Sequence, residues 1–191
     1  MAILYNIKKA VITELDPSTG KPKADGVVAH IKTAQKAELE PVLSEGEEDI
    51  LRNDVSILAV VRTDDLIYGY DIKLTDNQFD DTMAGLVAGY KVEKAAGTNK
   101  LSTPMMSEGN VAKPFKLELY VANYSGDSIV NYAKVTLNKC TGKFPTMTVG
   151  DGFFAPEFEI KARENTKANL PIKEIEFVDT LPTDDGDHPQ L

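Results

Sequence analysis

A change in hydrophobic period between residues 66 and 90 constrains the fold of this chain most tightly. Over residues 66–74 apolar side chains alternate with polar ones, which predicts a β-strand with one buried face. From residue 75 onward the apolar spacing becomes that of one helical stripe. The stripe is predicted to pack the helix onto a β-sheet through Phe79, Met83, Leu86 and Val87.

The predicted helix covers about residues 76–88 and has recognisable ends. Thr75 and Gln78 have the spacing of a capping box, in which each side chain satisfies the other residue's backbone N–H. Asp76, Asp80 and Asp81 suit the positive end of the helix dipole. Asp76, Gln78 and Asp80 have a spacing similar to that of a calcium loop, but the central glycine and closing glutamate of such a loop are missing, so helix capping explains them better. Gly89 fits a left-handed C-terminal cap.

The rest of the chain consists mostly of short apolar runs separated by turn residues. Residues 55–62 form a nearly continuous apolar run, which is typical of a strand buried on both faces, and a tight turn at Asp64 and Asp65 is expected to follow it. The remaining predicted strands cover residues 3–15, 27–33, 37–40, 90–95, 115–122, 129–140, 146–149, 154–162 and 172–178.

Two long loops are expected between these strands. Residues 34–54 are acidic and contain Pro41 and Gly46, so only a short strand is expected there before a loop. Residues 96–114 are rich in small polar residues and carry Met105 and Met106, which suit either a contact surface or burial under the loop.

These patterns predict a mainly β fold, an antiparallel β-sandwich or barrel with one flanking α-helix. The length favours a single domain, about residues 1–180, followed by a flexible acidic tail at residues 181–191. No signal peptide or membrane-spanning run is recognisable, so a soluble protein made in the cytoplasm is expected.

The sequence offers little material for catalysis or metal binding. His30 lies in a predicted strand and His188 in the tail, and neither is accompanied by a nucleophile and an orienting acid. Cys140 is the only cysteine and is expected to be a small buried hydrophobe. Glu157 and Glu159 are expected on an outward polar row. We therefore expect no enzyme, no catalytic or metal-binding residues and no cofactor.

Several ordered segments together resemble the major tail tube proteins of bacteriophages and prophages of Gram-positive bacteria. They are GEEDILRND, SILAVVRTDDLIYGYDIKLTDNQFDDTMAGLVAG, PFKLELYVANYSGDSIVNYAKVTLNKCTGKF and TVGDGFFAPEFEIKAREN. The resemblance covers most of the chain and rests on the order and spacing of these landmarks. None of them is a catalytic signature.

The resemblance implies a structural virion protein that folds as a β-sandwich with one helix. Such proteins form hexameric rings that stack into a hollow tube, and their inner strands join in a multi-subunit β-barrel through which DNA passes. The implied partners are further copies of the chain, the baseplate hub, the terminator, the tape measure and, in a contractile tail, a sheath. The implied location is the virion tail, assembled in the host cytoplasm.

The resemblance also implies roles for particular residues. The acidic segment 34–54 corresponds to a loop that reaches a neighbouring subunit or the next ring, and the candidates for such contacts are Glu38, Glu40, Glu45, Glu47, Glu48, Asp49, Met105 and Met106. The candidates for lining the channel are Glu38, Glu40, Asp71 and Lys73. Thirty acidic against twenty-one basic residues give a net charge of −9, so we expect a net negative channel wall that does not grip DNA.

Two other classes of function remain open. A tail terminator or baseplate hub protein would share the sandwich but form a single ring. A ligand-binding β-sandwich, such as a carbohydrate or adhesion module, is disfavoured because the chain has no tryptophan and few aromatic residues.

Overall fold

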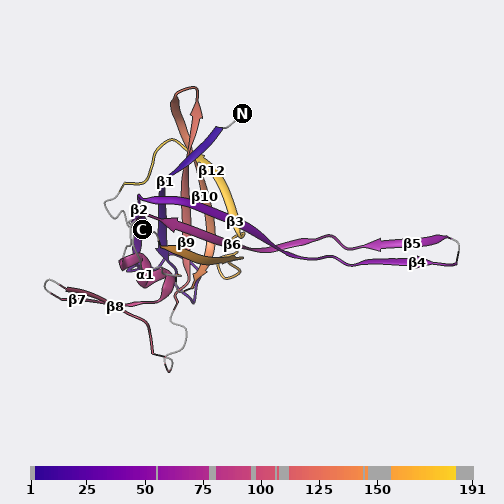
Figure 1. The fold of residues 1–191 in the computed structure, drawn as a ribbon, viewed down its shortest axis with the longest axis horizontal. Helices are drawn as coiled ribbons and strands as arrows, with labels where there is room; N and C mark the ends of the chain where they lie inside the picture. The colour runs from indigo at the N-terminus through magenta and orange to yellow at the C-terminus, as the bar shows by residue number, and fades with distance from the viewer. Residues whose placement is uncertain are drawn as a thin grey trace, which may run out of the picture.

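A computed structural model describes residues 3–54, 56–77, 81–95, 98–105, 107, 112–143, 145 and 156–183 (Figure 1). These residues contain twelve β-strands and one helix. In chain order the elements are β1 Ile3–Glu14, β2 Val28–Ile31, β3 Ala34–Ser44, β4 Glu48–Arg52, β5 Ile57–Arg62, β6 Leu66–Asp76, α1 Asp81–Ala88, β7 Lys91–Ala95, β8 Thr98–Ser102, β9 Phe115–Ser125, β10 Ser128–Gly142, β11 Glu157–Arg163 and β12 Lys173–Val178.

Most strands belong to one antiparallel sheet in the order β2-β1-β9-β10-β11-β6-β3. Strand β10 organises this sheet, because β9 pairs along one of its edges while β12 and β11 share the other. The predicted fold class is therefore confirmed: the chain is mainly β and antiparallel, with one helix in the described residues.

The buried apolar side chains of these strands form one hydrophobic core. Its largest members come from β1, β6, β9, β10 and β11, and helix α1 adds Met83, Leu86 and Val87 to it. Gly142 allows the close approach of α1, because a Cβ there would lie 2.1 Å from the carbonyl oxygen of Val87. Phe79, the fourth predicted helix-packing residue, lies outside the described residues.

Two pairs of the predicted strands, 3–15 with 27–33 and 115–122 with 129–140, form antiparallel hairpins. They are β1 with β2 and β9 with β10. The tight turn between β9 and β10 places Gly126 at a φ of +62°, a conformation that glycine adopts without a steric penalty. Gly89 has a φ of +71° and ends helix α1 as expected.

The predicted start of the helix is wrong. Thr75 is not an N-cap, because it lies in β6 between Lys36 of β3 and Glu157 of β11. Asp76 is also a strand residue, and its backbone N–H donates to the carbonyl of Pro156. Pairing on both sides of β6 therefore outweighs the local capping pattern, and the described helix begins at Asp81. Gln78, Asp80 and the predicted strand at 146–149 lie outside the described residues.

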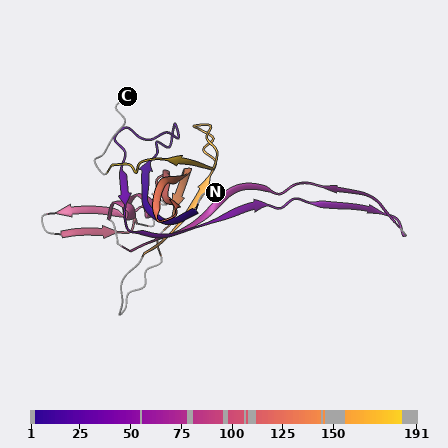
Figure 2. The same ribbon diagram turned by 90° about the horizontal axis from the view of Figure 1, so that it is seen from above.

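The short strand predicted at residues 37–40 lies within β3, but the acidic loop predicted after it is wrong, because the chain continues in β3 and then forms β4. Strand β3 pairs with β6, and β4 pairs with β5, so the chain forms one long two-stranded ribbon that projects from the sandwich (Figures 1 and 2). Asp64 and Asp65 lie within this ribbon and make no tight turn. The chain instead reverses at Asn53, whose side chain accepts a hydrogen bond from the backbone N–H of Ser56 at 2.8 Å.

A second, shorter ribbon replaces part of the predicted loop at residues 96–114. Strand β8 pairs with β7 from Lys91↔Ser102 to Ala95↔Thr98. This ribbon projects from the side of the sandwich opposite the long one (Figures 1 and 2). Met105 follows β8 and is 71% exposed, whereas Met106 lies outside the described residues.

Candidate assembly surfaces

The long ribbon is the most unusual surface of the molecule. We call residues 42–68 the arm; they comprise β4, β5 and the outer ends of β3 and β6. None of the described residues from 43 to 68 is buried. Its exposed large apolar side chains are Leu43, Ile50, Leu51, Ile57, Leu58, Val60, Val61, Leu66, Ile67 and Tyr68.

These apolar side chains occupy both faces of the arm. Ile50 lies directly opposite Val60, so the two share one face. Leu51 and Val61 occupy the next positions along their strands and therefore lie on the other face, where they are 61% and 64% exposed. The predicted burial of residues 55–62 on both faces of a strand is therefore wrong for the single chain.

Side-chain hydrogen bonds link the two strands of the arm in the gap between the β3–β6 pairing and the β4–β5 pairing. Thr63 and Asp65 accept hydrogen bonds from the backbone N–H groups of Glu47 and Gly46, each at 2.8 Å. The strands come so close here that a Cβ at Gly46 would lie 1.8 Å from the carbonyl oxygen of Thr63. Gly46 is therefore required by close packing of the backbone, and not by a loop.

The acidic contact candidates lie along the arm and its base. Glu45, Glu47, Glu48 and Asp49 are all exposed. Residues 45–65 contain seven carboxylates and only two arginines, Arg52 and Arg62. The outer arm is therefore both apolar and strongly negative.

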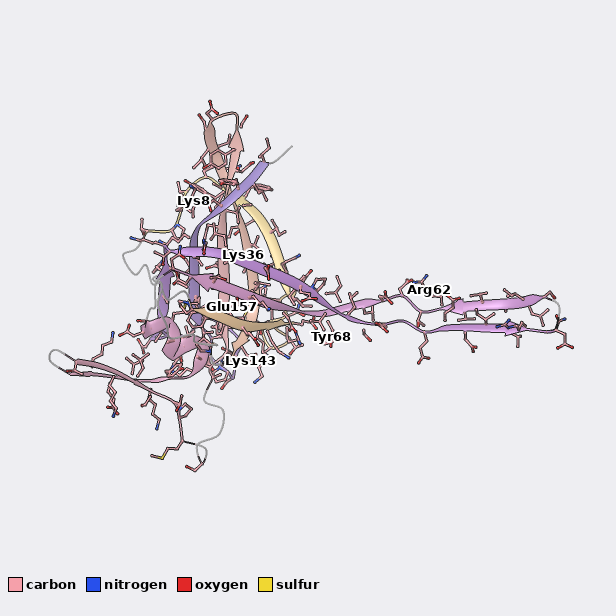
Figure 3. The ribbon with its side chains drawn as sticks, in the orientation of Figure 1. Lys8, Lys36, Arg62, Tyr68, Lys143 and Glu157 are labelled. Carbon is pink, nitrogen blue, oxygen red and sulfur yellow. The ribbon has the colours of Figure 1, made fainter. Side chains whose placement is uncertain are left out.

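The four candidates for the channel wall lie together on one sheet face. Glu38 is opposite Lys73, and Glu40 is opposite Asp71, in the ladder between β3 and β6. Strand β11 continues this face with Glu157, Glu159, Lys161 and Arg163, which are opposite Thr75, Lys73, Asp71 and Gly69 (Figure 3). We call this surface the charged face.

Neighbouring side chains of the charged face form ion pairs. Lys143 lies 3.2 Å from Glu159, Arg163 lies 3.8 Å from Asp71, and Lys36 pairs with Glu38. A hydrogen bond from Lys36 and its positive charge hold the pKa of Glu38 below its ordinary value.

Positive and negative groups are balanced on this face. Its carboxylates are Glu38, Glu40, Asp71, Glu157 and Glu159, and its cations are Lys36, Lys73, Lys143, Lys161 and Arg163. The expected excess of negative charge is therefore absent from this face among the described residues.

The described residues offer no alternative site with obvious chemistry. They contain no group of three or more His, Cys, Asp or Glu side chains placed to hold a metal ion. Cys140 is fully buried, and burial raises the pKa of its thiol, so a reactive thiolate is disfavoured. Within the same described residues, no helix is long and apolar enough to cross a membrane.

Comparison of the sequence with protein-family models gives no match, and comparison with curated proteins gives no significant match. We therefore infer function from the arm and the charged face, together with the sequence landmarks.

The exposed apolar side chains of the arm were missed as contact residues, although the sequence carried a signal for them. Two strand-like segments flank Asn53 and Asp54, a pair of residues favoured in turns. Recognising that turn would have predicted a hairpin in place of a loop followed by a buried strand.

Proposed function

We propose that this chain is the subunit of a bacteriophage or prophage tail tube and that it assembles with copies of itself into stacked rings. The ordered sequence landmarks described above point to this family. The arm supplies an independent physical reason for self-assembly. Ring size, which the resemblance implies to be six, is part of the same proposal.

The exposed arm is the observation that carries the proposal. An isolated two-stranded ribbon is marginally stable in water, and this one presents large apolar side chains on both faces. Contiguous exposed apolar surface of this kind marks a site of protein contact. A neighbouring subunit on each face would remove these side chains from water and fix the ribbon.

The charged face supports a role in lining a channel. Its ion pairs neutralise the carboxylates and cations locally, so the face offers no cluster of unpaired cations that would hold a phosphate backbone. A wall of this kind would let DNA pass without arresting it.

Negative-stain electron microscopy of the purified protein, over a range of concentrations, tests the proposal. We expect long hollow tubes with a regular axial repeat. Single rings that no baseplate seed extends would favour a terminator or hub protein. A monomer that persists at every concentration, with and without seeds, would contradict self-assembly and favour a binding module.

A matched variant without the arm makes the test specific. Replacing residues 45–65 by Asn-Gly joins Ser44 to Leu66, which are opposite each other, through a two-residue hairpin loop. Because none of the removed residues that the structure describes is buried, we expect the sandwich to fold with a thermal midpoint near that of the natural chain. The variant should form no tubes.

A further inference from the structure

A hollow lies on the opposite side of the sandwich from the arm, between helix α1 and strand β7. Its volume is about 420 Å³, enough for a few side chains. Its apolar wall is formed by Val27, Leu86 and Val92, with Gly85 and Gly89 of the helix region leaving the space open. The short β7–β8 ribbon extends beyond it (Figures 1 and 2).

Among the described residues, the charged side chains that line the hollow are all lysines: Lys91, Lys94 and Lys113. Lys94 lies 3.0 Å from the Asp81 carboxylate, and Lys113 lies 3.0 Å from Glu14. Each ammonium has three donors, so a single carboxylate does not exhaust it. The ion pair with Asp81 holds Lys94 at the rim, and the hydrogen bond from Lys94 holds the pKa of Asp81 below its ordinary value.

The end of the arm is complementary to this hollow, because it carries exposed apolar side chains beside carboxylates. Leu51 and Ile57 are both about 60% exposed beside the turn at Asn53. Asp49 lies two residues before Leu51 on β4, so it shares the face of Leu51, and it is exposed. Apolar side chains flanked by carboxylates thus occur at one end of the molecule, and an apolar hollow rimmed by lysines occurs at the other.

We propose that the end of the arm of one copy docks in the hollow between α1 and β7 of the next copy. Leu51 enters the apolar hollow, while Asp49, which lies on the same face of β4, approaches Lys91 and Lys94. The inference rests on the proposed self-assembly and names the surface that receives the arm.

The positions of the two surfaces determine the kind of assembly that results. Because they lie at opposite ends of the long axis, one contact leaves an arm and a hollow free for further copies (Figures 1 and 2). Such a head-to-tail contact produces either a closed ring or an extended polymer, and not a symmetric dimer.

Site-specific cross-linking tests this docking. Cys140 is fully buried, so an exposed cysteine introduced elsewhere becomes the main target of a maleimide reagent. The double variant Leu51→Cys with Lys91→Cys, assembled and treated with a short bismaleimide, should give a ladder of covalent oligomers on a denaturing gel. Ala59→Cys in place of Leu51→Cys provides a second position on the same face of the arm, opposite Leu51, if the first variant assembles poorly.

A matched control uses Leu51→Cys with Asp127→Cys. Asp127 is exposed in the turn between β9 and β10, away from the hollow (Figure 1). Tubes that show no ladder for the Lys91→Cys pair, or an equal ladder for the control, would overturn the docking and leave the proposed function intact. Absence of any assembly by the natural chain would overturn the proposed function, and the docking with it.

Charge reversal gives an independent measurement. Asp49→Lys should lower the assembled fraction by roughly tenfold, and adding Lys91→Glu should restore part of the loss, as expected for charges that are in contact. If Lys91→Glu deepens the defect, the arm does not meet this lysine and the docking is wrong.

Discussion

At the scale of single residues, Glu14 is a carboxylate that the fold keeps charged in a nearly buried position. Its side chain is 5% exposed and lies 3.0 Å from the Lys113 ammonium and 3.4 Å from the Lys23 ammonium. The backbone N–H of Val27 donates to it at 3.2 Å. Burial acts to raise its pKa, but the hydrogen bonds and the two positive charges outweigh burial and lower the pKa.

Replacement of Glu14 should therefore lower the free energy of unfolding by an amount that depends on pH. At pH 7 we expect Glu14→Gln to lower the free energy of unfolding by about 1–3 kcal/mol, because charge-assisted hydrogen bonds are lost in a buried place. A carboxylate with a lowered folded-state pKa stabilises the fold fully above its unfolded pKa of about 4.3. Its contribution is lost as the pH falls through the folded-state pKa.

Urea denaturation of the natural chain and of Glu14→Gln at pH 7 and pH 3 measures this cost. The difference between the two proteins should shrink at pH 3. Glu164→Gln, at an exposed position, should show little difference at either pH and serves as the control. A Glu14→Gln difference that stays constant or grows on acidification would contradict the role assigned to Glu14.

At the scale of secondary structure, the sequence predicted best those elements whose burial depends on this chain alone. Strands β9 and β10 were predicted because residues 115–122 alternate and Gly126 lies in a turn-forming segment. The alternation of Glu38, Glu40, Asp71 and Lys73 likewise predicted polar strand positions, and these four residues do share one face. Local pattern and tertiary environment agree at these positions.

The arm and the start of the helix were missed for two different physical reasons. The apolar run in β5 has the composition of a buried strand, yet its side chains are exposed in the described part of the chain. Periodicity cannot tell whether an apolar face is covered by the same chain or by another. Thr75 has the spacing of a helix cap, but pairing with Lys36 and Glu157 places it in a strand.

A substitution at Gly46 tests whether the two strands of the arm must stay close together for tubes to form. Because a Cβ there would meet the Thr63 carbonyl at 1.8 Å, Gly46→Ala should force the two strands of the arm apart. We expect the stability of the sandwich to change by less than about 0.5 kcal/mol, since the site is remote from the core. The yield of tubes, measured by sedimentation, should fall sharply.

Glu45→Ala is the matched control for this substitution, because it changes an exposed neighbour without the close backbone contact. It should assemble far better than Gly46→Ala. Equal tube yields for Gly46→Ala and the natural chain would show that the arm tolerates separation at this point and acts only through its end.

At the scale of the whole molecule, a tube of stacked rings needs two kinds of contact. One contact closes the ring, and the other repeats along the axis. The arm has apolar side chains on both faces, so each face can serve a different neighbour. In the proposed tube, the charged face of β3, β6 and β11 then remains for the channel, where its balanced ion pairs oppose tight binding of DNA.

The placement of the charged face can be tested by adding positive charge. Glu38→Lys with Glu40→Lys removes two carboxylates that lie near Lys36, Lys73 and Lys143. Tubes of this variant, grown in the presence of short double-stranded DNA, should retain the DNA and protect it from nuclease. Retention should fall steeply with salt, because phosphate contacts release counterions. Tubes of the natural chain should retain little DNA.

Asp127→Lys with Asp179→Lys makes the same change in net charge at exposed positions outside the charged face. This control therefore distinguishes an effect of where the new cations lie from an effect of the total charge of the protein. Tubes of this control should leave any bound DNA open to nuclease, because its new cations would lie outside the channel. Protection by the Glu38→Lys, Glu40→Lys tubes alone would support the charged face as the channel wall. Equal protection by both variants, or DNA that remains fully digestible on the Glu38→Lys, Glu40→Lys tubes, would place that face on the outside and require another surface to line the channel.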